Sequence, residues 1–352
     1  MTSVDPRFAT PAERSQASKV SDPAEILVGM DEGYRIFVEA WDPSYGTPMD
    51  ADSGPTGEST AQLVLDVELP AGAWTPLTAP PQTRAPSVVL LVDGVLRTDA
   101  WLWIEEADGT MHPGLAASYA AGVVRCDLAR GAAEVAPTRV DRGLFTPSTR
   151  ARDLVAANTR YPVRHVAAFD PAQLRGQVAA RMQALEQEVA TAARSLDPGE
   201  DDLLVADGPL RLDGLARALG FVKTHRVQYL PAELSPLVGR LRAGQRCPVF
   251  LLSDRRNRYT WYLKLPGPAG SPWAGVVRVE ASADLTPTEA VRLADLSTVT
   301  LPRFASTAYK DARAPQNLTP IAGLERRLRG MLGDQRLLLR SLSAAAAAQR
   351  AA

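Results

Sequence analysis

The chain of 352 residues lacks several features that common protein classes require. It has two cysteines, Cys126 and Cys247, without CxxC spacing, which argues against a disulfide framework or a structural zinc site. Its three histidines form no HExxH pair, so a bound metal would need mainly oxygen ligands, which favours Mg²⁺ or Mn²⁺. No apolar run approaches the roughly 18 residues of a membrane span. The dinucleotide-binding GxGxxG, P-loop and GxSxG motifs are also missing.

The composition is that of an ordinary soluble globular protein, with 45% hydrophobic and 22% charged residues. The formal net charge of -1 provides no global basic field. This is only weak evidence against a nucleic-acid role, because local patches matter more than the sum. The N-terminus lacks a basic region followed by an apolar one, and the isolated cysteines suit a reducing compartment. We therefore expect a cytoplasmic protein.

Shifts in composition along the chain predict how it is organised. Residues 1–25 are polar and without periodicity, so we expect a disordered N-terminal arm. The alanine-rich residues 343–352 predict a flexible tail. No clear linker divides residues 26–342, which we expect to form a single domain with its core at about 87–230.

The core segment begins with a β-rich pattern and changes period after Pro171. Strands are predicted at 88–92, 98–105, 118–127 and 133–140, and again at 202–206. Between them, apolar residues from Leu174 to Ala192 recur at three- and four-residue steps, which indicates a helix. Asp170 and Pro171 are suited to be its N-cap and first residue.

The resulting order is strand, strand, strand, helix, strand, which is the order of the ribonuclease H fold. We therefore expect an α/β protein with a ribonuclease H-like mixed sheet and additional C-terminal strands and helices. The additional strands are predicted at 249–252, 259–265 and 275–281, and the additional helices at 286–296 and 321–342.

Two predicted strands end in the same dipeptide, Asp93-Gly94 and Asp207-Gly208. An aspartate at the end of a buried strand is costly unless a cation compensates it, and the following glycine leaves room for another group. Two such carboxylates could share a divalent metal that holds water for attack on phosphorus. The alternative is that both dipeptides are ordinary turns with solvated aspartates, since Asp-Gly is a common turn sequence. The sharper hypothesis is a metal-dependent nuclease.

The predicted helix offers two further carboxylates, Glu186 and Glu188. They point about 200° apart on a helix, so only one of them can face the site. We list both as catalytic candidates and prefer Glu186 as the metal ligand because it follows Leu185 beside the apolar stripe. Asp311 is a candidate for an additional ligand, although its segment could equally be a proline-bounded loop that caps the last helix.

Three basic residues are candidates for contacts to DNA phosphates. Lys223 and Arg226 lie in a short basic cluster after the second Asp-Gly segment, and Arg278 alternates with valines in a predicted strand. Lysine and arginine supply the charge neutralisation that nucleic-acid backbones need. A solvated loop is the alternative interpretation of the basic cluster.

Taken in order, these segments resemble the NurA nuclease family, over most of the chain from Ser87 to about Leu332. The resemblance rests on the helix with its glutamates and on Leu90–Gly94, Leu203–Leu210, Gly220–Lys223, Gly275–Glu280 and Asp311–Pro315. It implies a ribonuclease H-like homodimer, a Mn²⁺- or Mg²⁺-dependent nuclease that acts on DNA ends. We expect its DNA partner to be ends or single strands. The resemblance also implies a HerA-type hexameric DNA-translocating ATPase as partner in recombinational repair. By the same resemblance, Asp93, Asp207 and one helix glutamate are metal ligands.

The chain departs from the family pattern before its last helix. The family commonly shows a Tyr-Pro pair followed by a histidine, whereas Thr319 and Glu325 stand at these positions here. Glu325 can bind a metal, but it cannot act as a neutral imidazole. This motivates a second hypothesis, a non-catalytic adaptor that binds DNA and docks on the ATPase. The third is a soluble α/β domain with unrelated ligands.

Overall fold

The computed structural model describes residues 61–167, 169–196, 201–225, 227–254, 256–267 and 271–351. All of them fall in one unit, Glu39–Ala352. The predicted N-terminal arm and Arg226 lie outside the described residues.

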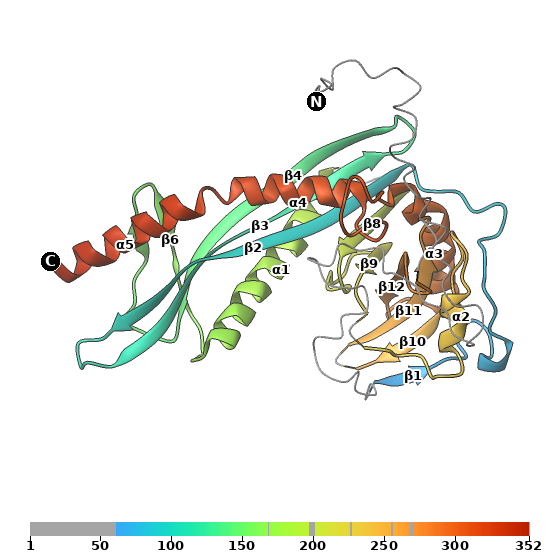
Figure 1. Cartoon of the computed structure of the whole chain (residues 1–352), viewed down its shortest axis with the longest axis horizontal. Coiled ribbons are helices and arrows are strands. Elements are labelled where there is room, and N and C mark those ends of the chain that lie inside the picture. Colours follow the sequence, from blue (N-terminus) through green and yellow to red (C-terminus); the bar gives the residue numbers. More distant parts are fainter. Residues whose placement is uncertain are drawn as a thin grey trace, which may run out of the picture. The chain divides into compact units, whose positions relative to one another are not determined.

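Ten of the described strands form one mixed sheet, in the order β1-β10-β11-β12-β9-β8-β2-β3-β4-β7 (Figure 1). The remaining two, β5 and β6, pair as a separate hairpin. The strands are β1 (Gln62–Val64), β2 (Val88–Glu105), β3 (Met111–Asp127), β4 (Ala132–Thr146), β5 (Leu154–Ala156), β6 (Thr159–Tyr161), β7 (Val163–His165), β8 (Asp202–Asp207), β9 (Ala218–Val222), β10 (Phe250–Ser253), β11 (Asn257–Lys264) and β12 (Val276–Ser282). The predicted mixed α/β sheet is therefore confirmed.

The helices are α1 (Pro171–Leu196), α2 (Ser235–Gly239), α3 (Pro287–Thr300), α4 (Thr319–Met331) and α5 (Gln335–Ala351), with short 3₁₀ helices at Ala71–Ala73 and Leu301–Phe304. As predicted, α1 starts at Pro171, and Asp170 Oδ1 accepts a hydrogen bond from the Gln173 N–H at 2.9 Å. None of the helices in the described ranges is long and apolar enough to cross a bilayer.

Two predictions about the C-terminal segment differ from the structure. The single helix expected at 321–342 is two helices, because Gly333 between them adopts a φ of +81°, which glycine tolerates and which ends α4. The residues expected to form a flexible tail continue α5 as helix through Ala351.

The strand β2 corrects the expectation that Asp93 ends a strand. The segments predicted as two strands, 88–92 and 98–105, form the single strand β2, which runs through Asp93 and Gly94. This strand pairs with β3 along its length, and Asp93 lies opposite Gly122. This pairing satisfies the backbone groups that a turn would have left free, so the alternative turn interpretation is also wrong at Asp93. Asp207 does end β8, and Gly208 follows it with a φ of +107°.

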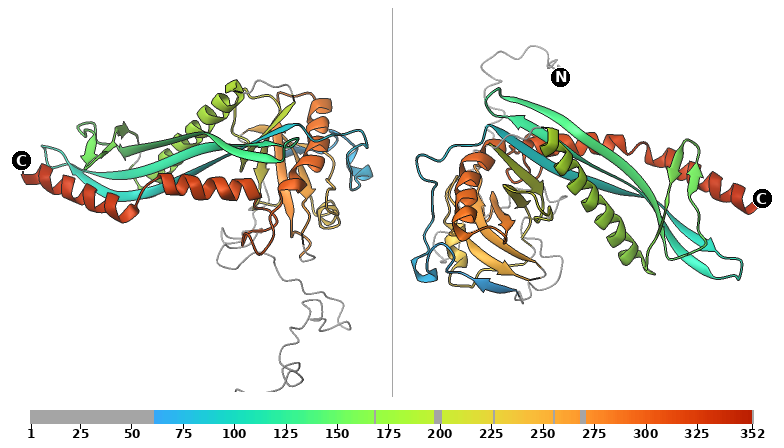
Figure 2. Two further views of the ribbon diagram at one scale, coloured as in Figure 1. Left: turned by 90° about the horizontal axis from the view of Figure 1, so that it is seen from above. Right: turned by 180° about the vertical axis from the view of Figure 1, so that it is seen from behind.

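Successive residues of β2 face opposite sides of the sheet, and a helix covers each side (Figure 2). Leu90 and Val92 pack in the same cluster as Leu185 of α1. Leu91 and Val95 pack in the cluster that contains Leu324 of α4. By this alternation, Asp93 faces the α4 side and Gly94 faces the α1 side.

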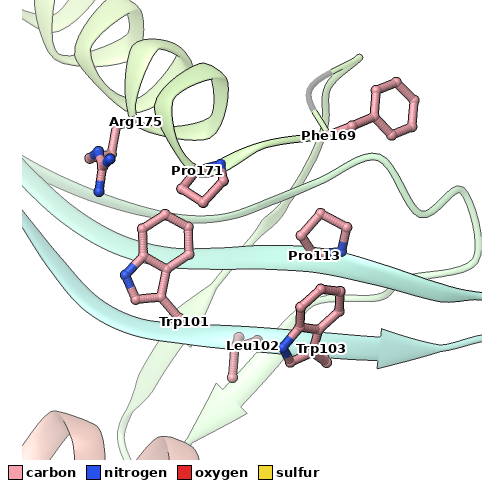
Figure 3. A pocket seen from close by; sticks show the side chains of 7 residues that line it. All are labelled: Trp101, Leu102, Trp103, Pro113, Phe169, Pro171 and Arg175. Atoms are coloured by element: carbon pink, nitrogen blue, oxygen red, sulfur yellow. The ribbon is translucent and has the colours of Figure 1, made fainter.

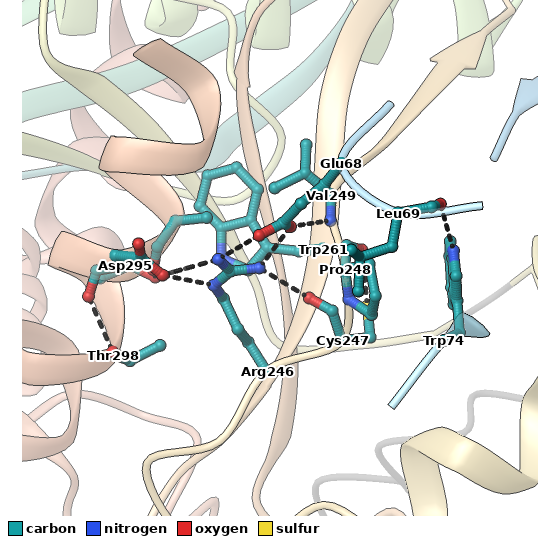
Figure 4. A network of polar contacts seen from close by, with 12 residues as sticks. Glu68, Leu69, Trp74, Arg246, Cys247, Pro248, Val249, Trp261, Asp295 and Thr298 are labelled. Carbon is teal, nitrogen blue, oxygen red and sulfur yellow. Dashed lines mark hydrogen bonds and ion pairs between the residues drawn. The ribbon is translucent and has the colours of Figure 1, made fainter. Parts of the chain in front are cut away.

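A buried arginine fixes the segment after β1 and the helix α3 to the same part of the sheet (Figure 4). Arg246 is 1% exposed and contacts Glu68 at 2.7 Å and Asp295 at 2.6 Å. Glu68 also accepts a hydrogen bond from the Val249 N–H. Charge-assisted bonds of this kind compensate the cost of burying the guanidinium group.

Candidate active site

The structure brings Asp93 and Asp207 together. Strands β2 and β8 are parallel neighbours, and their paired register ends with Val92 opposite Ala206. The next residues, Asp93 and Asp207, therefore stand side by side and point to the same face of the sheet. Asp93 is 8% exposed, and the Asp207 side chain is 13% exposed. Two neighbouring carboxylates in a mostly buried position form an acidic centre that calls for a cation.

The electrostatics of Asp93 reflect this crowding. Burial raises the pKa of Asp93 well above its usual value, and the charge of Asp207 raises it further. Lys223 acts in the opposite direction, and the carboxylates of Glu186 and Glu325 make smaller contributions that raise it. A cation bound between these groups would favour their ionised forms.

Glu186 comes from α1 and lies against Gly94, on the face of β2 opposite to the one toward which Asp93 points. A Cβ atom placed on Gly94 would lie 2.6 Å from Glu186 Oε1, so a larger residue here would require the end of the Glu186 side chain to move. Burial raises the pKa of Glu186 to about 7, with a further increase from Asp207 and a decrease from Arg211. Glu186 is thus near enough to Asp207 for the two charges to interact, but it lies on the α1 side of the sheet.

Glu188 points elsewhere, as the helical rotation predicts for one of the two glutamates. Its side chain is 52% exposed and pairs with Arg139 at 3.3 Å. Its carboxylate is therefore held on the outer side of α1, away from Asp93 and Asp207.

A chain of polar contacts extends the site from Asp207 to Asp311. Lys223 Nζ donates to Asp207 Oδ2 at 2.6 Å and to Asn317 Oδ1 at 2.9 Å. Asn317 is completely buried, and its Nδ2 donates to Asp311 Oδ2 at 2.6 Å. Asp311 therefore belongs to the same network, but Lys223 and Asn317 stand between it and Asp207. In this arrangement Asp311 accepts a hydrogen bond from Asn317 and is linked to Asp207 through Asn317 and Lys223.

The loop after Asp207 is held in place by a close backbone approach and a buried glutamate. A Cβ atom on Gly220 would collide with the backbone nitrogen of Leu210, so glycine lets this loop cross β9. The Leu210 N–H donates to Glu280 Oε2 at 3.0 Å, and Glu280 is completely buried.

Arg278, predicted as a phosphate contact, instead pairs with Glu280, the glutamate that holds the loop after Asp207. Its Nη1 lies 2.8 Å from Glu280 Oε1, and its guanidinium group lies 4.7 Å from the ring centroid of Tyr229. Arg278 is only 6% exposed because both faces of β12 are covered. This position does not present the guanidinium group to DNA, so the prediction is not supported at Arg278.

At the α4 side of the site, two arginines surround Glu325. Arg313 Nη2 lies 2.9 Å from Glu325 Oε2, and Arg329 Nη2 lies 2.8 Å from Oε1. Burial raises the pKa of Glu325, but the bonds to Arg329 and Arg313 outweigh burial and lower it. Thr319, at the start of α4, is exposed. Sequence reasoning did not select Arg313, although it stands two residues after Asp311.

The donor set of the acidic centre fits a hard divalent cation. Asp93 and Asp207 offer carboxylate oxygens, and the buried Asp207 Oδ1 has no hydrogen-bond partner among the described residues. Within the described ranges, however, no three or more His, Cys, Asp or Glu side chains are already gathered as a ligand set. Lys223 supplies the positive charge beside Asp207, so a bound ion would require this ammonium group to move.

Comparisons with known proteins give no family assignment. No family model matches the chain, and no curated protein matches it. Among solved structures, Endonuclease V from Bacillus subtilis is 14% identical with a TM-score of 0.33, covering 73% of this chain and 86% of that one. The catalytic domain of human Endonuclease V is 14% identical with a TM-score of 0.30, covering 71% and 87%. These TM-scores are too low for either likeness to carry an argument about activity.

Proposed function

We propose that the protein is a divalent-metal-dependent nuclease that hydrolyses phosphodiester bonds at DNA ends. The observation that carries this proposal is the placement of Asp93 and Asp207 at neighbouring positions on adjacent parallel strands, with Glu186 close to Gly94 on the α1 side of β2. A buried carboxylate with a raised pKa beside a second carboxylate, as at Asp93, is typical of a functional site.

The strand topology supports a ribonuclease H-like fold. In sequence order, β2, β3 and β4 form antiparallel pairs, α1 follows, and β8 then lies parallel to β2 on its free side. This is the arrangement that the strand, strand, strand, helix, strand order predicts. It also explains why two aspartates 114 positions apart become neighbours.

In this proposal, Asp93 and Asp207 hold Mg²⁺ or Mn²⁺, and Glu186 is the third carboxylate. A bound ion would activate a water molecule and stabilise the charge that develops on the phosphate. With a pKa of about 7, Glu186 can hold or release a proton at neutral pH. Lys223, once released from Asp207, can neutralise a phosphate oxygen of the substrate.

The resemblance to the NurA family supplies the cellular setting of the proposal. It implies a homodimer that works with a HerA-type hexameric translocase in DNA repair or recombination. Asp93, Asp207 and a helix glutamate match the family's ligand pattern, whereas Thr319 and Glu325 depart from it.

The test is the degradation of end-labelled linear DNA during a titration with MnCl₂ and MgCl₂. Asp93→Asn and Asp207→Asn should each abolish cleavage without unfolding the protein. Glu188→Gln is the matched control, because it changes a carboxylate on the same helix that points away from the site. Cleavage at the wild-type rate by Asp93→Asn would refute the assignment.

A second candidate function is a non-catalytic adaptor that binds DNA and stimulates or docks on the ATPase. The observation that favours it is that Glu325, at the family's histidine position, is held by Arg313 and Arg329. DNA binding or ATPase stimulation without any degradation across the metal titration would establish this alternative over the nuclease.

A further inference from the structure

A solvent-facing groove lies on the α1 side of the sheet, at the start of α1. Its volume is about 480 Å³. Three aromatic side chains dominate it, and Trp103 and Phe169 are 71% and 69% exposed (Figure 3). The full lining is Trp101, Leu102, Trp103, Pro113, Phe169, Pro171 and Arg175. Large aromatic rings exposed together mark a binding surface.

An irregularity in β2 turns these tryptophans toward α1. Before it, Gly94 faces α1, so Leu96 and Thr98 share that face by the two-residue period of a strand. The register with β3 shifts between Thr98 and Ala100, which moves the alternation by one residue. After the shift, Trp101 and Trp103 take the α1 face.

The charge beside the aromatic rings is positive. The Arg175 guanidinium group lies 5.6 Å from the centroid of the Trp101 ring, and Figure 3 shows the two side chains directed toward each other. Residues 171–185 of α1 include Arg175 and Arg181 and no aspartate or glutamate. Aromatic rings combined with guanidinium groups are how proteins hold single-stranded nucleic acid without reading its sequence.

The groove lies along the same side of α1 as Glu186. Arg175 precedes Glu186 by 11 positions on α1, which corresponds to about 17 Å along the helix axis. Eleven residues turn the helix by about three full turns plus 20°, so both side chains emerge from nearly the same side. A few nucleotides of single strand can cover that span.

We propose that this aromatic groove binds the bases of single-stranded DNA on the α1 face of the sheet. The inference rests on the proposed nuclease function and adds a contact surface for its DNA, separate from the Asp93–Asp207 centre on the α4 face. The groove volume falls in the range of sites for small molecules, which suits individual bases.

The test measures the affinity for fluorescein-labelled oligo-dT by anisotropy in EDTA, so that no cleavage takes place. Trp103→Ala and Arg175→Ala should each raise the Kd at least about fivefold, since stacking contributes roughly 1–3 kcal/mol per base. Trp103→Phe should retain most of the affinity and Trp103→Leu should lose it. Leu339→Ala, an apolar residue of α5 that is 47% exposed and does not line the groove, is the control and should change nothing.

Other results would overturn the inference. Equal affinity of the wild type and Trp103→Ala for oligo-dT would show that the groove does not bind DNA. A loss of self-association in Trp103→Ala by sedimentation, with oligo-dT affinity unchanged, would make the groove an interface between copies of this chain. Hydrolysis of bis(p-nitrophenyl) phosphate by the wild type with Mn²⁺ tests the nuclease separately. If the wild type does not hydrolyse this substrate but Trp103→Ala still weakens the affinity for oligo-dT, the proposed nuclease function is wrong. The role of the groove in binding single-stranded DNA would then be supported on its own.

Discussion

The substitution Glu186→Gln tests the acidic centre through its effect on stability. Glu186 is partly buried beside Gly94 and close enough to Asp207 for the two charges to repel. Glutamine keeps the size and shape of the side chain and removes its ability to ionise. In metal-free buffer we therefore expect the variant to be more stable than the wild type at alkaline pH.

The magnitude follows from the pKa of Glu186, which burial and Asp207 raise from 4.5 to about 7. Between these values the unfolded chain has lost a proton that the folded protein keeps, so stability falls as the pH rises. The penalty is absent below pH 4.5 and complete above about pH 7, where it reaches about 3 kcal/mol. For a chain of this size, this corresponds to about 5 °C in the melting temperature.

The assay is thermal unfolding of both proteins in EDTA at several pH values from 4 to 8.5. The melting temperature of Glu186→Gln should exceed that of the wild type above pH 7, and the difference should shrink toward pH 4.5. Glu188→Gln, whose carboxylate is exposed, should show no such trend. A difference that is independent of pH, or that has the opposite sign at pH 8, would refute the reasoning.

Three further substitutions probe the surrounding contacts. Gly94→Ala places a Cβ 2.6 Å from Glu186 Oε1, so it should displace that carboxylate and abolish metal-dependent DNA cleavage. The urea midpoint should change little, because the displaced atom is the end of a flexible side chain; full cleavage activity would contradict this. Lys223→Met removes the ammonium group 2.6 Å from Asp207, so the melting temperature in EDTA should fall. Added Mn²⁺ should then raise the melting temperature of the variant more than that of the wild type. An unchanged melting temperature in EDTA would show that the Lys223–Asp207 ion pair does not stabilise the fold. Arg246→Met leaves the carboxylates of Glu68 and Asp295 without their cation and should lower the free energy of unfolding by about 3–5 kcal/mol, measured as a lower urea midpoint. A midpoint equal to that of the wild type would show that these ion pairs contribute little to stability.

The sequence predicts the acidic centre because local patterns identify both strands and their aspartates. The apolar runs before Asp93 and Asp207 mark buried strands, and the helix between them requires a parallel crossover. The apolar stripe of α1 also favours Glu186, since it lies next to Leu185, which is buried in the structure. These are short-range signals, and in the structure Asp93 and Asp207 stand at neighbouring positions on adjacent strands.

What the sequence does not predict depends on distant contacts. Asp93-Gly94 has the composition of a turn, but pairing with β3 on one side keeps β2 extended through it. The contact between Lys223 and Asn317 joins residues 94 positions apart, and no local pattern indicates it. Arg278 alternates as an exposed strand residue would, yet Glu280 and neighbouring elements bury it.

The most direct test of the central claim is anomalous diffraction from crystals soaked in Mn²⁺. The account predicts a manganese peak bonded to carboxylate oxygens of both Asp93 and Asp207, with Lys223 Nζ moved away from Asp207. A peak bound elsewhere, or Lys223 still in contact with Asp207 and no ion between the two aspartates at saturating Mn²⁺, would contradict it.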